Sequence, residues 1–146
     1  NVFELMMKTN AFIGGEGNGG IIYPSSHYGR DSMVGVALFL TYLANQDKTV
    51  AEIRASYPQY FMSKNKIELT PQIDVDNVLA TLTEKYKSEN ITTIDGVKID
   101  FSTEWVHLRK SNTEPIIRIY TESPTQIEAD VLAERFVKEL KEIAGI

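Results

Sequence analysis

The chain has 146 residues, enough for one well-buried core or for a small domain with part of another. Its 15 Lys and Arg against 20 Asp and Glu give a net charge of -5, which argues against general nucleic-acid binding because such proteins usually carry a basic face. The sequence has no cysteine, so disulfides and thiolate metal sites are excluded. No apolar run reaches the roughly 20 residues that a membrane span needs. We therefore expect a soluble, cytoplasmic protein, and the missing initiator Met suggests a piece of a longer chain.

The first third of the sequence predicts short elements around a glycine-rich turn. Residues 2–7 are typical of the end of a helix, and residues 11–13 of a short buried strand. Glycines dominate residues 14–20, which indicates a turn, and residues 21–23 resume a strand that Pro24 and the two following serines end.

Two helices are predicted next. Asp31 or Ser32 can cap the first of them, and residues 33–43 are apolar almost all round, which is typical of a buried helix. Thr49 with Glu52 three residues later forms the pattern of a capping box for the second. That helix should end near Tyr57, because Pro58 disfavours a helical conformation in the residue before it.

From about Tyr60 onward the order of elements changes. Residues 60–69 suit a strand, Asp74 or Asp76 can cap a helix, and Asp95-Gly96 signals a tight turn. The predicted helical face comprises Val75, Val78, Leu79, Leu82 and Tyr86. Strands are predicted at residues 97–101, 105–109 and 116–122. Thr125 and Glu128 then open a last helix, whose predicted apolar stripe comprises Ile127, Val131, Phe136, Leu140 and Ile143.

This order describes an α+β domain, an antiparallel sheet with helices on one face. The first ~58 residues cannot close a core alone on surface-to-volume grounds. We place a domain boundary near Tyr57-Pro58, which divides the chain into residues 1–58 and 59–146.

The glycine-rich loop, residues 15–20, satisfies the pattern G-x-G-x-x-G of dinucleotide-binding folds. That pattern has meaning only between a strand and a helix, and here a strand and a proline follow. One alternative is a hairpin turn in which glycines permit positive φ. The other is a ligand site, because Glu16 and Asn18 could bind neighbouring hydroxyls of a sugar ring.

A second loop, residues 109–115 with the sequence Arg-Lys-Ser-Asn-Thr-Glu-Pro, brings two cations, two hydroxyls and an amide into a turn between strands. A phosphate dianion binds to such a set of guanidinium, hydroxyl and main-chain N–H donors. A polar hairpin turn without a ligand explains the same residues equally well on chemistry alone.

Together these loops resemble those of a known family, the α-D-phosphohexomutases, which include phosphoglucosamine mutases, phosphoglucomutases and phosphomannomutases. Arg-x-Ser-Asn-Thr-x-Pro resembles their C-terminal phosphate-binding loop, and the loop at residues 15–20 resembles their sugar-recognition loop, Gly-Glu-x-Ser/Asn-Gly. The resemblance spans essentially the whole chain and identifies it as the C-terminal portion of such an enzyme. It implies a remnant of domain 3, of α/β mixed-sheet type, at residues 1–58, and a complete domain 4, similar to the TATA-box-binding-protein fold, at residues 59–146.

The resemblance also implies which residues contact the substrate. Glu16, Gly17 and Asn18 would contact sugar hydroxyls. The residues that would hold the phosphate not being transferred are Arg109, Ser111, Asn112, Thr113 and Arg118. The implied reaction interconverts a hexose 6-phosphate and 1-phosphate through a bisphosphorylated sugar, most like phosphoglucosamine mutase. Glucose and mannose phosphates are the alternative substrates.

The catalytic parts of the family are absent from this sequence. Neither the serine loop, Thr-x-Ser-His-Asn-Pro, nor the Mg²⁺-binding run, Asp-Gly-Asp-x-Asp-Arg, occurs. We therefore expect no catalytic residue and no metal site here, Mg²⁺ and the other domains in the longer chain, and no activity from this part alone. Gly20 also stands where many members have His. The alternatives to the enzyme are a non-catalytic phosphosugar-binding module and a purely structural domain.

Several other residues could have either a functional or a structural role. His27 could replace the missing imidazole or cap a turn. The pair of Asp74 and Asp76 resembles a metal-binding pair, but helix capping explains it better. His107 is expected to pack near the second loop.

Overall fold

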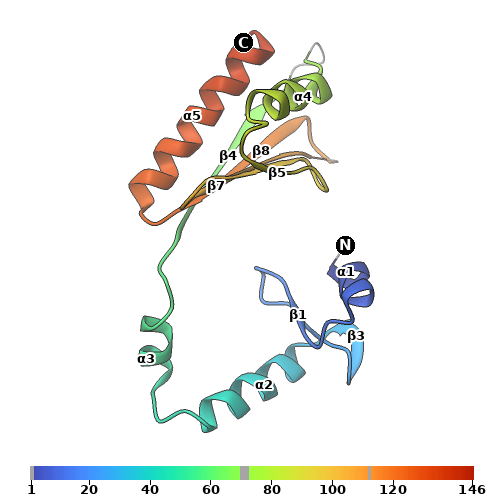
Figure 1. Ribbon diagram of the computed structural model, residues 1–146, viewed down its shortest axis with the longest axis vertical. Coiled ribbons are helices and arrows are strands. Elements are labelled where there is room, and N and C mark those ends of the chain that lie inside the picture. The colour runs from blue at the N-terminus through green and yellow to red at the C-terminus, as the bar shows by residue number, and fades with distance from the viewer. Residues whose placement is uncertain (1, 70–72, 112) are drawn as a thin grey trace. The chain divides into compact units, whose positions relative to one another are not determined.

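The structure, a computed structural model, describes residues 2–69, 73–111 and 113–146. The chain divides into two compact units, Asn1–Tyr57 and Pro58–Ile146, each with its own sheet (Figure 1).

The first unit contains three helices and a small antiparallel sheet of order β1-β2-β3. Its elements are α1 (Val2–Thr9), β1 (Gly14–Gly15), β2 (Ile21–Tyr23), β3 (His27–Arg30), α2 (Ser32–Ala44) and α3 (Val50–Ala55). The predicted helices and the strand at β2 are confirmed. Asp31 caps α2, and Thr49 forms the expected capping box with Glu52.

The prediction of a buried strand at residues 11–13 is wrong. Asn10 adopts a positive φ of 50° just after α1, and the chain reverses there before pairing begins at Gly14. Phe12 and Ile13 are 69% and 49% exposed. An apolar run of three residues is too short to distinguish a strand from a connection. Strand β3 was not predicted, because its four residues, all of them exposed, show no apolar alternation.

The prediction of a buried helix at residues 33–43 is also wrong for this chain. None of the residues of α2 is buried. Its exposed large apolar side chains are Met33, Val36, Phe39, Leu40 and Tyr42. The buried apolar residues of the unit are only Met6, Ile22 and Ile53 among those the structure describes. Three short strands and two short helices do not supply enough surface to cover a 13-residue apolar helix.

The second unit is the predicted α+β domain. Five antiparallel strands have the order β4-β8-β7-β6-β5, and helices α4 and α5 lie on one face of the sheet (Figure 1). The elements are β4 (Phe61–Glu68), α4 (Val75–Lys85), β5 (Asn90–Thr92), β6 (Val97–Asp100), β7 (Trp105–Lys110), β8 (Ile116–Ser123) and α5 (Gln126–Ala144). Only β5 was not predicted.

The core of this unit lies between the sheet and the two helices. It includes Val78 and Leu82 of α4, as predicted, and Phe136 and Leu140 of α5. The strands contribute Ile67, Val97, Ile99, Val106, Leu108, Ile117 and Ile119. These residues alternate along the strands with side chains of the opposite face, which is mostly polar but includes Trp105.

The apolar stripe predicted for α5 is partly wrong. Ile127 and Val131 are 76% and 59% exposed, whereas Ala129 and Ala133 are buried. The buried face of α5 comprises Ala129, Leu132, Ala133, Phe136 and Leu140. The buried hydroxyl of Thr121 donates to the carbonyl of Ala129 at 2.7 Å. The prediction is confirmed for Phe136, Leu140 and Ile143 and is wrong only in the first turns, where smaller residues face the sheet in place of Ile127 and Val131.

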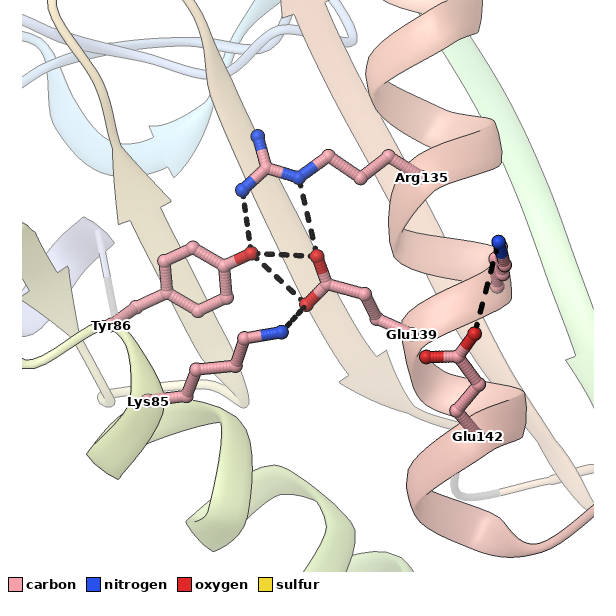
Figure 2. A network of polar contacts seen from close by, with 6 residues as sticks. Lys85, Tyr86, Arg135, Glu139 and Glu142 are labelled. Atoms are coloured by element: carbon pink, nitrogen blue, oxygen red, sulfur yellow. Dashed lines mark hydrogen bonds and ion pairs between the residues drawn. The ribbon is translucent and has the colours of Figure 1, made fainter.

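A network of polar side chains joins α4 to α5 (Figure 2). The carboxylate of Glu139 accepts from Lys85 Nζ at 2.9 Å, from Tyr86 Oη at 2.8 Å and from Arg135 Nε at 3.2 Å. Arg135 Nη2 also donates to Tyr86 Oη at 2.6 Å. Burial by itself would raise the pKa of Glu139, but these three donors together outweigh it, and the pKa is lowered.

Gly96 fixes the turn that leads into β6. Its φ is +81°, and a Cβ placed there would lie 2.2 Å from the carbonyl oxygen of Leu108. Both the backbone conformation and the close approach to β7 therefore require glycine.

Gly96→Ala should lower the free energy of unfolding of the second unit by about 3 kcal/mol, because it adds both a left-handed alanine and a steric overlap. Gly145→Ala is the matched control: its φ is +74°, but no atom lies within 4 Å of the added Cβ. It should cost only about 1 kcal/mol. Urea unfolding followed by the fluorescence of Trp105, the single tryptophan, measures both. If both variants lose the same free energy of unfolding, steric overlap with the Leu108 carbonyl oxygen does not contribute to the cost at Gly96.

Glu139→Gln should lower the free energy of unfolding by about 1–3 kcal/mol at pH 7, since Lys85 and Arg135 lose a largely buried anionic partner. The side chain of Glu139 is 14% exposed. Its pKa is below the ordinary value of 4.5, so its contribution is complete above pH 4.5 and is lost as the pH falls through the lowered pKa.

Urea unfolding of both proteins between pH 7 and pH 3 measures this effect, and the difference between them should shrink below pH 4.5. Glu142→Gln is the control, because Glu142 makes only an exposed 3.9 Å pair with Lys138 (Figure 2). It should change stability by less than about 0.5 kcal/mol. A difference for Glu139→Gln that stays constant down to pH 3 contradicts the assignment.

Candidate functional site

The glycine-rich loop closes a hairpin between β1 and β2. The Glu16 N–H donates to the carbonyl of Gly20, and the Gly19 N–H donates to the carbonyl of Glu16, both at 3.0 Å. Gly19 has a φ of +88°. An antiparallel strand follows the loop, so the strand-to-helix context of a dinucleotide-binding glycine pattern is missing.

Glu16 and Asn18 orient each other within this loop. Asn18 Nδ2 donates to Glu16 Oε2 at 3.0 Å, and Asn18 Oδ1 accepts from the Gly20 N–H at 2.9 Å. The other carboxylate oxygen of Glu16 lies 3.0 Å from Arg30 Nε on β3. The sequence alone did not indicate a role for Arg30. The arrangement presents a fixed carboxylate and an amide next to an exposed Gly17 backbone.

His27 is engaged by the turn that leads to α2. Its Nδ1 accepts from the Gly29 N–H at 2.9 Å, so the ring proton lies on Nε2, which is 3.0 Å from Asp31 Oδ2. Asp31 Oδ1 accepts from the first N–H groups of α2. The N–H of Val34 first, and then His27, lower the pKa of Asp31. These contacts account for His27 as part of a turn and helix cap.

The second loop connects β7 to β8. The Ser111 N–H donates to the Ile116 carbonyl at 3.0 Å and closes the loop. The hydroxyls of Ser111 and Thr113 are 3.3 Å apart, and the Thr113 N–H points at Ser111 Oγ at 3.4 Å. Asn112, the other predicted phosphate ligand of this loop, lies outside the described residues.

The two cations that begin this loop lie on opposite faces of the sheet. Arg109 is on the open face, where its guanidinium lies 3.2 Å from Asp95 Oδ2. Lys110 is on the helix side, where its amine lies 3.9 Å from Asp76 Oδ1 at the start of α4. Only one of these two neighbouring cations can therefore act on the open face.

Strand pairing brings a second arginine beside the first. Arg118 of β8 is directly opposite Arg109 of β7, so both side chains leave the same face. The guanidinium of Arg118 lies 3.5 Å from Glu114 Oε2. The turn before β6 supports this arrangement, because His107 Nε2 lies 2.6 Å from the Asp95 carbonyl oxygen while the Asp95 side chain holds Arg109. The sequence alone gave Asp95 no such role.

The predicted residues thus form two groups. Arg109, Ser111, Thr113 and Arg118 gather around one loop of the second unit, and Glu16, Gly17 and Asn18 around one loop of the first. Two guanidinium groups with adjacent hydroxyls can bind an anion with several oxygen acceptors. Within residues 2–69, 73–111 and 113–146, no group of three or more His, Asp or Glu could hold a metal ion. The same residues contain no helix long and apolar enough to cross a membrane.

Comparison with family models covers both units. Residues 1–60 match the model described as phosphoglucomutase/phosphomannomutase, alpha/beta/alpha domain III. Residues 43–139 match the model of the phosphoglucomutase/phosphomannomutase C-terminal domain.

Similar proteins bear related names. A phosphoglucosamine/phosphogalactosamine mutase of Sulfurisphaera tokodaii is 40% identical over 136 residues, 92% of this chain and 29% of the relative. A phosphoglucomutase/phosphomannomutase of Thermococcus kodakarensis is 38% identical over 143 residues, 97% of this chain and 31% of the relative. The chain therefore spans about a third of the length of these relatives.

The fold has a solved counterpart. The crystal structure of a phosphoglucomutase/phosphomannomutase family protein from Burkholderia thailandensis matches with a TM-score of 0.70 at 21% identity, over 97% of this chain and 30% of that one. Because a family model matches residues 43–139, more than half of its length, this chain belongs to the phosphoglucomutase/phosphomannomutase family.

Proposed function

We propose that this chain is the C-terminal part of a phosphohexomutase that acts as a phosphoglucosamine mutase. The longer enzyme interconverts the 6-phosphate and 1-phosphate of an amino sugar through a bisphosphorylated intermediate. This part supplies substrate recognition: the first unit contacts sugar hydroxyls, and the second unit holds the phosphate that is not being transferred.

One observation carries the proposal, the in-register pair of Arg109 and Arg118 beside the hydroxyls of Ser111 and Thr113. Like charges directly opposite on neighbouring strands are unfavourable, and the exposed pairs with Asp95 and Glu114 offset this cost only weakly. An anion bound between them removes that cost and accepts hydrogen bonds from both guanidinium groups. Asn112 is the remaining candidate ligand in the loop.

The hairpin of the first unit supports the choice of a sugar phosphate. Glu16 accepts hydrogen bonds at both carboxylate oxygens, and Asn18 both donates and accepts. Neighbouring hydroxyls of a sugar ring can exchange with these contacts, because a hydroxyl both donates and accepts. Arg30 keeps the carboxylate in place.

The name of the Sulfurisphaera tokodaii relative, which specifies glucosamine and galactosamine phosphates, supports the amino sugar. A second candidate is a phosphoglucomutase/phosphomannomutase, the name of the 38% identical relative. The difference between these two identities is too small to decide the substrate.

The domain assignment follows from the same resemblance. Residues 1–58 are the end of the third domain, and residues 59–146 are the fourth. The exposed apolar side chains of α2 support this assignment, because a helix of that composition belongs in the interior of a larger domain. The described residues do not fit a magnesium site, so Mg²⁺ would be held by another part of the enzyme, and this chain by itself would not catalyse phosphoryl transfer.

Arg109→Ala in the 146-residue chain should weaken binding of glucose 6-phosphate at least tenfold, since a charge-assisted hydrogen bond contributes about 1.5–3 kcal/mol. Amide chemical shifts of Ser111 and Thr113 during a titration measure it, and weak binding of the chain itself is expected because few contacts surround the ligand. Lys110→Ala removes the same charge from the opposite face and should change the affinity less than about twofold. Shifts that persist in Arg109→Ala mean that phosphate is held elsewhere.

A mutase assay of the full-length enzyme tests the activity. Turnover should be fastest with glucosamine 6-phosphate and slower with glucose or mannose 6-phosphate. Replacement of Glu16 by Gln in that enzyme should raise KM, because one carboxylate acceptor becomes an amide. Preference for glucose or mannose phosphate selects the second candidate function, and no turnover on any of the three contradicts the mutase assignment.

A further inference from the structure

The cations of the open sheet face extend beyond the loop onto strand β4. Lys66 of β4 is directly opposite Arg118 of β8, which in turn is opposite Arg109 of β7. Paired residues of an antiparallel sheet point to the same face. Three cations therefore form one row across three adjacent strands, on the face that α4 and α5 leave open (Figure 1).

Two of these cations have carboxylate partners, and the third has none among the residues that the structure describes. Asp95 lies 3.2 Å from Arg109, and Glu114 lies 3.5 Å from Arg118. Across the part of the chain that the structure describes, no hydrogen bond or ion pair restrains the exposed side chain of Lys66. Its charge remains available for an anion beside Arg118.

A cavity of about 370 Å³ lies at this position. Lys64 and Lys66 of β4 line one side of it, Arg118 and Tyr120 of β8 line the other, and Glu114 lines the end near the loop. Lys64 is already engaged, because its amine lies 5.7 Å from the centroid of the Tyr120 ring. Lys66 is therefore the cation of β4 best placed to meet a ligand of Arg118.

We propose that Lys66 is a further phosphate-binding residue, which shares with Arg118 a phosphomonoester dianion held at the loop. This assignment rests on the proposed function and adds to it a contact from a strand outside the loop. Arg118 offers a planar fork of donors, whereas Lys66 offers a point charge on a flexible stem, so the two can bind different oxygens of one phosphate. The charge of Lys66 also offsets the carboxylate of Glu114, which lines the same cavity and competes for Arg118.

The test compares two lysines of the same face. Lys66→Gln in the 146-residue chain should weaken binding of glucose 6-phosphate and of inorganic phosphate roughly fivefold, the effect of a favourable exposed ion pair. Lys98→Gln makes the same change of charge at a lysine that already pairs with Asp100 and lies over the Trp105 ring at 5.1 Å. It should alter affinity less than about twofold. Lys66→Arg should restore most of the binding, and amide shifts of Ser111 and Thr113 report each titration.

The outcomes distinguish a failure of this inference from a failure of the proposed function. Equal weakening by Lys66→Gln and Lys98→Gln overturns the inference, because it indicates only the general field of the face. Unchanged affinity in Lys66→Gln, with binding lost in Arg109→Ala, also overturns it and leaves the proposed function intact. Binding that survives Arg109→Ala removes the basis of both.

Discussion

Antiparallel pairing of β7 with β8 places Arg109 opposite Arg118 and Leu108 opposite Ile119, so a single register sets the open face and the core together. A slip of one residue would bury the arginines and expose the leucine and isoleucine. The apolar side chains under α4 and α5 therefore hold the candidate phosphate site in place. In this unit, hydrophobic burial determines where the charged groups lie, and the charged groups do not determine how the core packs.

The charges on the two faces are balanced in different ways. On the helix side, the largely buried carboxylate of Glu139 accepts from three donors, so both oxygens are occupied by the network that joins α4 to α5. On the open face, Asp95 and Glu114 neutralise two cations of a row of three, and their contacts are exposed. Exposed pairs are weak and can exchange with a ligand, whereas the Glu139 network is a fixed structural element.

The first unit builds its candidate site with much less core. Its loop depends on local contacts: the hairpin hydrogen bonds, the mutual contact of Glu16 and Asn18, and Arg30 reaching across from β3. His27 and Asp31 join the end of β3 to the start of α2 in the same local manner. Such contacts need only neighbouring residues, so they can form in a unit with few buried side chains.

The sequence by itself determined the elements whose signals are local. The capping boxes at Thr49 and Thr125, the Asp95-Gly96 turn and the alternation along β7 and β8 all depend on residues within a few positions of one another. The two candidate ligand-binding loops were likewise recognisable from their own residues. The sequence could not give the cross-strand partners of Arg109, the pairing of Glu16 with Arg30, or the face of α5 that is buried. Tertiary structure decided these, because register and helix phase depend on how distant segments pack, and a short apolar run such as residues 11–13 carries no information about what will cover it.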